Sequence, residues 1–233
     1  MATFVLVHGA WRGSFGFRHV RRGLQQAGHD ATAPSLTGLG ERAHLASPQV
    51  TLGTHVQDVV NHILYEDLQD VVLVGYSYGG AVVTACVDHI HERVRELVYL
   101  DAFVPADGQS LADLLGFPKL PITLGQDHFL PSSPRTFDDP TEAAFQQDRT
   151  VAHPLATAYE PIALHQPLED FPFGRTFVKA TGNDPDELGE GCFLAAAERA
   201  KTSDRWRYRE IDTNHMLLSN RPKEVTDLLL ELG

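Results

Sequence analysis

The sequence predicts an α/β fold: a doubly wound, mostly parallel sheet with a small, mainly helical, proline-rich cap insertion. Two observations predict it. Strand-like and helix-like segments alternate along most of the 233 residues, and a proline-rich stretch interrupts this alternation once. Strands separated by helices return to the same end of a sheet and pair in parallel. We therefore expect residues 1–103 and 174–233 to form the core and residues 104–173 to form the cap.

The first half of the chain supplies most of the expected core. Apolar and β-branched residues predict the strands, and uninterrupted apolar runs such as residues 71–74 predict strands covered on both faces. These strands are expected at residues 3–8, 30–36, 71–75 and 96–102. Apolar residues at helical spacing predict amphipathic helices between the strands. These helices are expected at residues 14–29, 53–66 and 78–90.

The second half begins with the predicted cap. Ten of the 14 prolines lie between Pro105 and Pro172, which favours short helices and disfavours long strands. Inserts of this kind cover the carboxyl edge of a parallel sheet, where ligands bind. The alternation then resumes. Strands are expected at 176–181 and 205–211, and helices at 186–201 and 221–232.

Composition excludes several function classes. The formal charge of −12 and the absence of Lys or Arg runs argue against a nucleic-acid partner. No basic leader precedes the short apolar start, and no later run is long enough to cross a bilayer, so we expect a cytoplasmic protein without a membrane partner. Cys86 and Cys192 form no CxxC pair, and we expect buried thiols without a disulfide or a metal.

The segment Gly-Tyr-Ser-Tyr-Gly, residues 75–79, follows the predicted strand 71–75 and precedes a predicted helix. A sharp turn from strand to helix strains its central residue and needs small neighbours. Gly75 and Gly79 meet this requirement around Ser77, which gives the G-x-S-x-G nucleophile elbow. The elbow exposes the hydroxyl of Ser77 at the edge of the sheet. Ser77 is therefore the candidate nucleophile.

A serine nucleophile needs a base, and position selects it among 12 histidines. His215 lies in the loop after the last predicted strand, where the base of this arrangement is expected. His8 follows the first strand and is expected to shape a loop. Three further histidines lie in the predicted cap and are candidates for contact with substrate, although a surface position is expected for any one of them: His128, His153 and His165.

Two aspartates are candidates for the acid that orients His215. The chain order Ser, Asp, His favours Asp184, which follows the predicted strand 176–181. Asp186, in the same turn, is better explained as a helix N-cap. Asp101 ends the predicted strand 96–102 and can reach the same imidazole from the neighbouring strand. We expect Asp184, with Asp101 as the alternative.

An oxyanion hole needs two backbone amides. The amide of Tyr78 follows the nucleophile at the start of a helix. The turn "HGAWRG" after the first strand lies beside the elbow and supplies the amide of Ala10. We expect these two amides to form the hole.

These motifs resemble the α/β-hydrolase family, and the resemblance extends over essentially the whole chain. More specifically, the chain resembles the branch of this family that contains plant hydroxynitrile lyases, salicylate-binding methyl esterases and bacterial esterases that cleave carbamates and pyrethroids. The segments that carry it are "FVLVHGAW", "LTGLGERAHL", "VVLVGYSYGG", "LVYLDAFVPADGQSL" and "DTNHM". The resemblance implies that Ser77 is the nucleophile, His215 the base, and Ala10 and Tyr78 the oxyanion donors.

Five positions are expected to border the substrate pocket: Gly9, Trp11, Arg12, Tyr76 and Met216. Hydroxynitrile lyases of this branch carry threonine and lysine where this chain has Gly9 and Met216, so the pattern resembles the esterases. Tyr76 and Arg12 depart from the histidines usual among the relatives.

The sequence therefore predicts a serine esterase that acts on a small carboxylic ester, or on a carbamate or amide, through an acyl-enzyme. No metal or organic cofactor is implied, and the expected assembly is a monomer or homodimer. Two alternatives remain open at this point: a lyase that uses the same triad, and a hydrolase-like ligand receptor.

Overall fold

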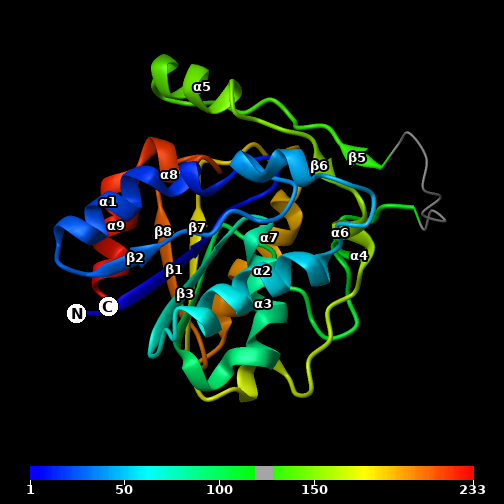
Figure 1. The fold of residues 1–233 in the computed structure, drawn as a ribbon. Helices are drawn as coiled ribbons and strands as arrows, with labels where there is room; N and C mark the ends of the chain where they lie inside the picture. Colours follow the sequence, from blue (N-terminus) through cyan, green and yellow to red (C-terminus); the bar gives the residue numbers. More distant parts are fainter. Residues whose placement is uncertain (119–127) are drawn as a thin grey trace.

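A six-stranded parallel sheet forms the centre of the protein in the computed structural model, which describes residues 1–118 and 128–233 (Figure 1). The strand order is β2-β1-β3-β4-β7-β8, and each neighbouring pair is parallel. This confirms the predicted fold class. The strands are β1 (Thr3–Val7), β2 (Asp30–Thr32), β3 (Val71–Tyr76), β4 (Val94–Leu100), β7 (Gly174–Ala180) and β8 (Arg207–Ile211).

Helices cover both faces of this sheet, as Figure 1 shows. One face packs against α1 (Arg18–Gln26), α8 (Leu217–Asn220) and α9 (Pro222–Leu230). The other packs against α2 (Leu52–Tyr65), α3 (Gly79–Ile90) and α7 (Glu190–Thr202). In the described part of the chain, four short 3₁₀ helices lie in the connections: η1 (Ser14–Phe17), η2 (Gly40–Leu45), η3 (His91–Arg93) and η4 (Leu168–Asp170).

The continuous apolar runs of the central strands are explained by these two layers. In β3, Val71 and Leu73 point into the core beneath α2 and α3. Val72 and Val74 point into the core beneath α1 and α9. Since successive side chains of a strand alternate between faces, a strand buried on both sides must be apolar throughout.

Several elements are shorter than the sequence predicts; the α-helix expected at 14–29, for example, is α1 at Arg18–Gln26, and two further cases have a clear cause. The expected strand 30–36 ends at Thr32, because Pro34 has no N–H for a ladder and the chain turns into a loop there. The expected helix 186–201 begins only at Glu190. Asp184 and Asp186 form a turn before it, and Gly189 adopts a left-handed φ of 94° at its N-cap.

The segment between β4 and β7 holds the predicted cap, of which residues 119–127 lie outside the described part. It contains the short helices α4 (Leu111–Leu114), α5 (Pro140–Gln147) and α6 (Ala156–Tyr159). It also contains a two-stranded antiparallel ribbon of β5 (Phe129–Leu130) and β6 (His153–Pro154). Figure 1 shows α5 extending along one edge, away from α4 and α6.

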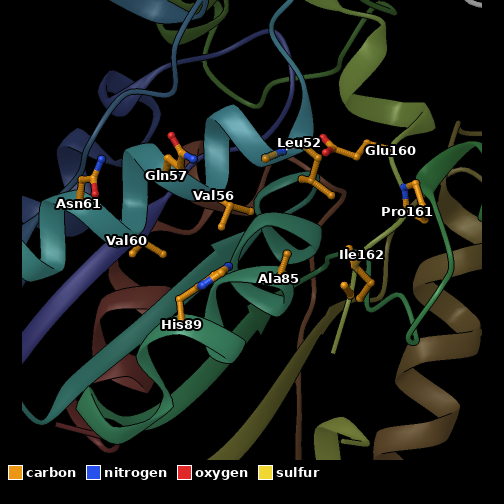
Figure 2. A pocket seen from close by; sticks show the side chains of 12 residues that line it. Leu52, Val56, Gln57, Val60, Asn61, Ala85, His89, Glu160, Pro161 and Ile162 are labelled. Atoms are coloured by element: carbon orange, nitrogen blue, oxygen red, sulfur yellow. Dashed lines mark hydrogen bonds between the residues drawn. The ribbon is translucent and has the colours of Figure 1, made fainter. Parts of the chain in front are cut away.

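Polar contacts fasten this segment to the core. A carboxylate oxygen of Glu160 accepts the backbone N–H of Gly53 at the start of α2, at 2.7 Å. Figure 2 shows Glu160 beside Leu52 at the end of a surface hollow between α2 and α3. This hollow is lined by Val56, Val60 and Ala85 among others.

No helix in the described ranges, 1–118 and 128–233, is both long and apolar enough to span a membrane.

Helix α3 approaches the sheet so closely that its first turn requires glycine. A Cβ on Gly79 would lie 2.3 Å from the carbonyl oxygen of Val7, and a Cβ on Gly80 would lie 2.3 Å from that of Phe103. Both distances are far below contact, and both obstacles are backbone atoms. The glycines therefore set the distance between α3 and the carboxyl edge of the sheet.

We predict that Gly80→Ala lowers the free energy of unfolding by about 3 kcal/mol or more, because backbone must move to admit the methyl group. Gly191→Ala is the matched control: it lies in α7, and a Cβ there meets nothing within 4 Å. The control should be neutral or stabilising by up to about 1 kcal/mol. Urea unfolding measures both, and equal effects would contradict the close-approach explanation.

Candidate active site

Ser77 occupies the turn between β3 and α3 with a left-handed φ of 54°. Such a conformation is costly for a residue with a side chain and persists only where its surroundings fix it. Here the Ser77 N–H donates to the Leu100 carbonyl at 3.2 Å, and the Ser77 carbonyl accepts the N–H groups of Gly80 and Phe103. The strained elbow is therefore held by backbone contacts on both sides.

The Ser77 hydroxyl lies in a hydrogen-bonded chain with two other side chains. Its Oγ is 2.9 Å from Nε2 of His215, and Nδ1 of His215 is 2.7 Å from Oδ2 of Asp101. A carboxylate only accepts, so Nδ1 carries the proton and Nε2 can accept the proton of the serine. All three residues are at least nine-tenths buried.

Asp101 is fully buried and is held by several donors. Lys179 Nζ lies 2.9 Å from Oδ1, Asn183 Nδ2 donates to Oδ2 at 2.8 Å, and the Ala180 N–H donates to Oδ1 at 3.2 Å. Lys179 also pairs with Glu190 at 3.0 Å. Burial raises the pKa of Asp101, but the His215 hydrogen bond and the charges of His215 and Lys179 outweigh it and lower that pKa overall.

The imidazole of His215 is enclosed by two aromatic rings. Tyr76 stacks on it at 5.0 Å between centroids and Phe193 at 4.9 Å. The Tyr76 hydroxyl also donates to the carbonyl of His215 at 2.8 Å. Burial is the main cause that lowers the pKa of His215; Asp101 partly opposes it, and Arg135 and Lys179 lower it further. The imidazole is therefore neutral near pH 7.

Asp184, the acid that the sequence favoured, is not the partner of His215 in this arrangement. Its Oδ1 accepts the backbone N–H of Asp186 at 3.0 Å, which closes the turn before α7. It lines a surface cavity that also reaches His215. Asp101 comes closer because β4 lies between β3 and β7 in the sheet. The geometry thus favours the alternative acid.

Ser77, Ala10 and Tyr78 line one small, mostly apolar cavity beneath the cap. Within the described residues, no protein acceptor takes the backbone N–H of Ala10 or of Tyr78. Both are therefore free to donate to a ligand. The other walls come mainly from apolar side chains, including Phe103, Leu111, Leu115, Leu130 and Leu188.

The five predicted pocket residues have different positions. Only Trp11 lines the cavity at Ser77, while a Cβ on Gly9 would come within 3.0 Å of the Ser77 Cβ. Tyr76 stacks on the ring of His215 and does not line the cavity at Ser77. Met216 lines a different cavity, the surface cavity that Asp184 and His215 also line. Arg12 is directed at the cap, where its guanidinium donates to the Gln146 carbonyl and Thr150 Oγ1.

Several cap residues line the cavity, and two of them, Arg135 and His153, have titratable side chains. Arg135 forms an ion pair with Glu187. His153 is 3% exposed, so the expected surface position is wrong for this residue. A proline-rich segment has no periodicity from which the direction of these side chains can be derived.

Two further buried histidines support the loops around the elbow. His8 Nε2 accepts the Leu36 N–H at 3.0 Å. His55 Nε2 lies 2.8 Å from the Thr37 carbonyl, and its Nδ1 lies 2.8 Å from the Tyr78 hydroxyl. Burial lowers the pKa of His8 and of His55 to about 4, so both are neutral. The hydroxyl of Tyr78 is thereby anchored to α2 through His55.

Comparisons with known proteins identify the family and the fold. The model of the family described as "Alpha/beta hydrolase family" matches residues 4–228. Among solved structures, an extracellular α/β-hydrolase from a Paenibacillus species superposes with a TM-score of 0.79 at 24% identity, covering 100% of this chain and 99% of that one. At this identity the superposition shows the fold.

Relatives with assigned names are esterases or related enzymes. A carbendazim hydrolyzing esterase of Nocardioides sp. (strain SG-4G) is 54% identical over 115 residues, which are 49% of this chain and 48% of that protein. That match therefore spans about half the length of the relative. Putative methylesterase 19 of Arabidopsis thaliana is 25% identical over 260 residues, covering 99% of this chain and 96% of that protein.

We predict that Lys179→Met shifts the acidic limb of the pH–activity profile to higher pH. The ammonium group lowers the pKa of His215, so its removal raises that pKa. The variant should also lose about 3–5 kcal/mol of unfolding free energy, because buried carboxylates lose their cation. Hydrolysis rates from pH 4 to 8 and urea unfolding measure the two effects.

The double variant Lys179→Met/Glu190→Gln is the matched control. It also removes the charge of Glu190, one of the two buried carboxylates that lose their cation when Lys179 is replaced. It should regain part of the lost stability and keep the shifted limb. An unmoved limb in a folded variant would contradict the electrostatic role of Lys179.

Proposed function

Since this chain belongs to the α/β-hydrolase family, we propose that it is a serine esterase that cleaves small carboxylic esters through an acyl-enzyme on Ser77. One observation carries the proposal. The hydrogen-bonded chain from Ser77 Oγ to His215 and on to Asp101 has heavy-atom distances of 2.9 and 2.7 Å. This is the arrangement that activates a hydroxyl nucleophile.

The reaction proceeds in two halves. Ser77 Oγ attacks the ester carbonyl carbon while His215 Nε2 takes the hydroxyl proton, and Asp101 stabilises the imidazolium. The amides of Ala10 and Tyr78 donate to the oxyanion. His215 then gives its proton to the departing alcohol, which leaves an acyl group on Ser77. Water, deprotonated by His215, releases the acid and restores the serine.

The lyase alternative would bypass the acyl-enzyme. A departing cyanide needs a cation beside it, and position 216 holds methionine. Arg135 supplies a cation in the cavity, but it is already paired with Glu187. The receptor alternative predicts ligand binding with negligible turnover. One observation separates the esterase from both alternatives: in the esterase an acyl group forms on Ser77 and is then released by water.

The test is p-nitrophenyl acetate hydrolysis combined with fluorophosphonate labelling and mass spectrometry. We expect turnover by the wild type with the label on Ser77. Ser77→Ala should lose the label and about 10⁴-fold or more of the rate. Asp101→Asn should lose about 10⁴-fold, because an amide selects the wrong tautomer of His215. Asp184→Asn is the matched control and should retain the wild-type rate.

The pH profile gives a second readout. His215 acts in its neutral form, and its pKa lies below 6.5. The value of kcat/KM should therefore be constant at pH 7 and fall only as the pH drops through this lowered pKa. A well-folded wild type with neither turnover nor label would exclude the esterase. A larger loss in Asp184→Asn than in Asp101→Asn would reverse the choice of acid.

A further inference from the structure

Residues 131–150 leave the two-stranded ribbon of the cap and return to it. β5 ends at Leu130 and β6 begins at His153, and these two residues are paired across the ribbon. Trp11 holds both ends of the segment: its Nε1 donates to the Leu130 carbonyl at 2.8 Å, and its own carbonyl accepts the Val151 N–H at 3.1 Å. We call residues 131–150 the flap, because its ends are fixed side by side while α5 extends from them along the edge of the molecule (Figure 1).

The flap is attached to the core without buried apolar side chains. All of its residues lie in the described part of the chain, and only Glu142 and Gln146 among them are buried. Its aromatic side chains are half-buried; Phe145 lies between the guanidinium groups of Arg18 and Arg149, each 3.9 Å from the ring centroid. Burial of apolar surface is the dominant favourable contribution to folding. A segment without it can open at a much lower free energy than the whole protein unfolds.

Polar contacts hold the flap in place. The buried Glu142 carboxylate pairs with Arg18 of α1. Its Oε1 also accepts hydrogen bonds from Ser219 Oγ of α8 at 2.9 Å and from Gln146 Nε2 at 2.8 Å. Glu142 therefore joins the flap to two core helices. Further contacts to the core join Thr136 to Asn214, Asp138 to Asn220 and Arg221, and both Gln146 and Thr150 to Arg12.

One residue of the flap forms part of the wall between two cavities. Arg135 lines the cavity at Ser77 and also the surface cavity at His215. Leu188 lines both cavities as well. Arg135 forms an ion pair with Glu187, the residue that precedes Leu188. This ion pair between the flap and the loop before α7 therefore closes the wall that the two cavities share.

The cavity at Ser77 is too small to hold an ester while this wall is closed. Its volume is about 40 Å³, which is room for about three water molecules. Ligand pockets of proteins have volumes of about 300–1,000 Å³. The surface cavity at His215 has a volume of about 550 Å³, and opening of the shared wall would join the two. The proposed reaction therefore requires a movement of this wall.

We propose that the flap is a gate that opens as a unit about the ends held by Trp11, and that this opening admits substrate to Ser77. This inference rests on the proposed function of Ser77 and concerns access to that site. The contacts of Glu142 hold the flap shut, and the ion pair of Arg135 with Glu187 closes the wall. Since opening precedes binding, the rate of any reaction at Ser77 is proportional to the open fraction.

The test measures the flap and Ser77 in the same variant. Glu142→Gln removes the charge that pairs with Arg18 and nearly preserves the shape of the side chain. Hydrogen–deuterium exchange with mass spectrometry measures the opening of residues 140–150, and the second-order rate of fluorophosphonate labelling measures access to Ser77. We expect both rates to rise by the same factor, about tenfold or more, because hydrogen bonds to a charged group are lost.

Two further variants complete the comparison. Asp227→Asn is the matched control, because it removes one carboxylate charge from an ion pair within α9, that of Lys223 with Asp227. It should change neither rate. Glu187→Gln removes the charge paired with Arg135 and so tests a different contact of the flap. It should accelerate both exchange and labelling, and it keeps the proposal testable if Glu142→Gln does not fold.

Faster exchange of the flap with unchanged labelling would overturn the proposal, because the flap would then open without controlling access to Ser77. Unchanged exchange and unchanged labelling would contradict it as well, since the contacts of Glu142 would then not hold the flap shut. Failure of the proposed function is a different result: Ser77 then takes no label in the wild type or in any variant, while exchange of the flap still responds to Glu142→Gln. That result would remove the basis of the gate along with the esterase.

Discussion

The close approach of α3 to the carboxyl edge of the sheet is the constraint on which the site depends. Gly79 and Gly80 place the start of this helix against the carbonyls of Val7 and Phe103. At this distance the preceding turn must be sharp, and Ser77 takes a left-handed backbone that its neighbours hold in place. The fold maintains this strained backbone without a ligand. The Ser77 hydroxyl and the Tyr78 N–H therefore already have the positions in which they would meet a ligand.

The buried charged residues beside the elbow also hold the site in one arrangement. Asp101, Lys179 and Glu190 are almost fully enclosed, and such an arrangement adds little stability over well-packed apolar residues. It does fix the orientation of Asp101, which has a left-handed φ of 43° and whose carboxylate is held by four partners: Lys179, the Ala180 N–H, Asn183 and His215. The fixed Asp101 carboxylate in turn orients His215, and this orientation is what the desolvation of the buried charges provides.

Much of the fold and part of the site could be predicted from the sequence. The apolar runs of β1 and β3 and the glycines around Ser77 are local signals, and His215 follows from its place after the last strand. The choice between Asp101 and Asp184 is not local, because both follow strands that end at the same edge of the sheet. Only the order of β3, β4 and β7 makes Asp101 the partner of His215.

The positions of the cap side chains could not be predicted from the sequence for another reason. Arg135 and His153 lie in segments whose direction is set by contacts with the core, such as the bond between Trp11 Nε1 and the Leu130 carbonyl. Short elements such as β5 and β6 have too few residues for a period to be read.

The position of the cap in the chain has a consequence for how such proteins diversify. Residues 101–173 connect β4 to β7, which are direct neighbours in the sheet. The entropy of closing a loop grows only with the logarithm of its length, so doubling this connection would cost the sheet only about 0.6 kcal/mol. Added length in this connection therefore costs the sheet little free energy. The cap walls of the cavity at Ser77 can therefore change in length while the strands that position Ser77, Asp101 and His215 keep their register.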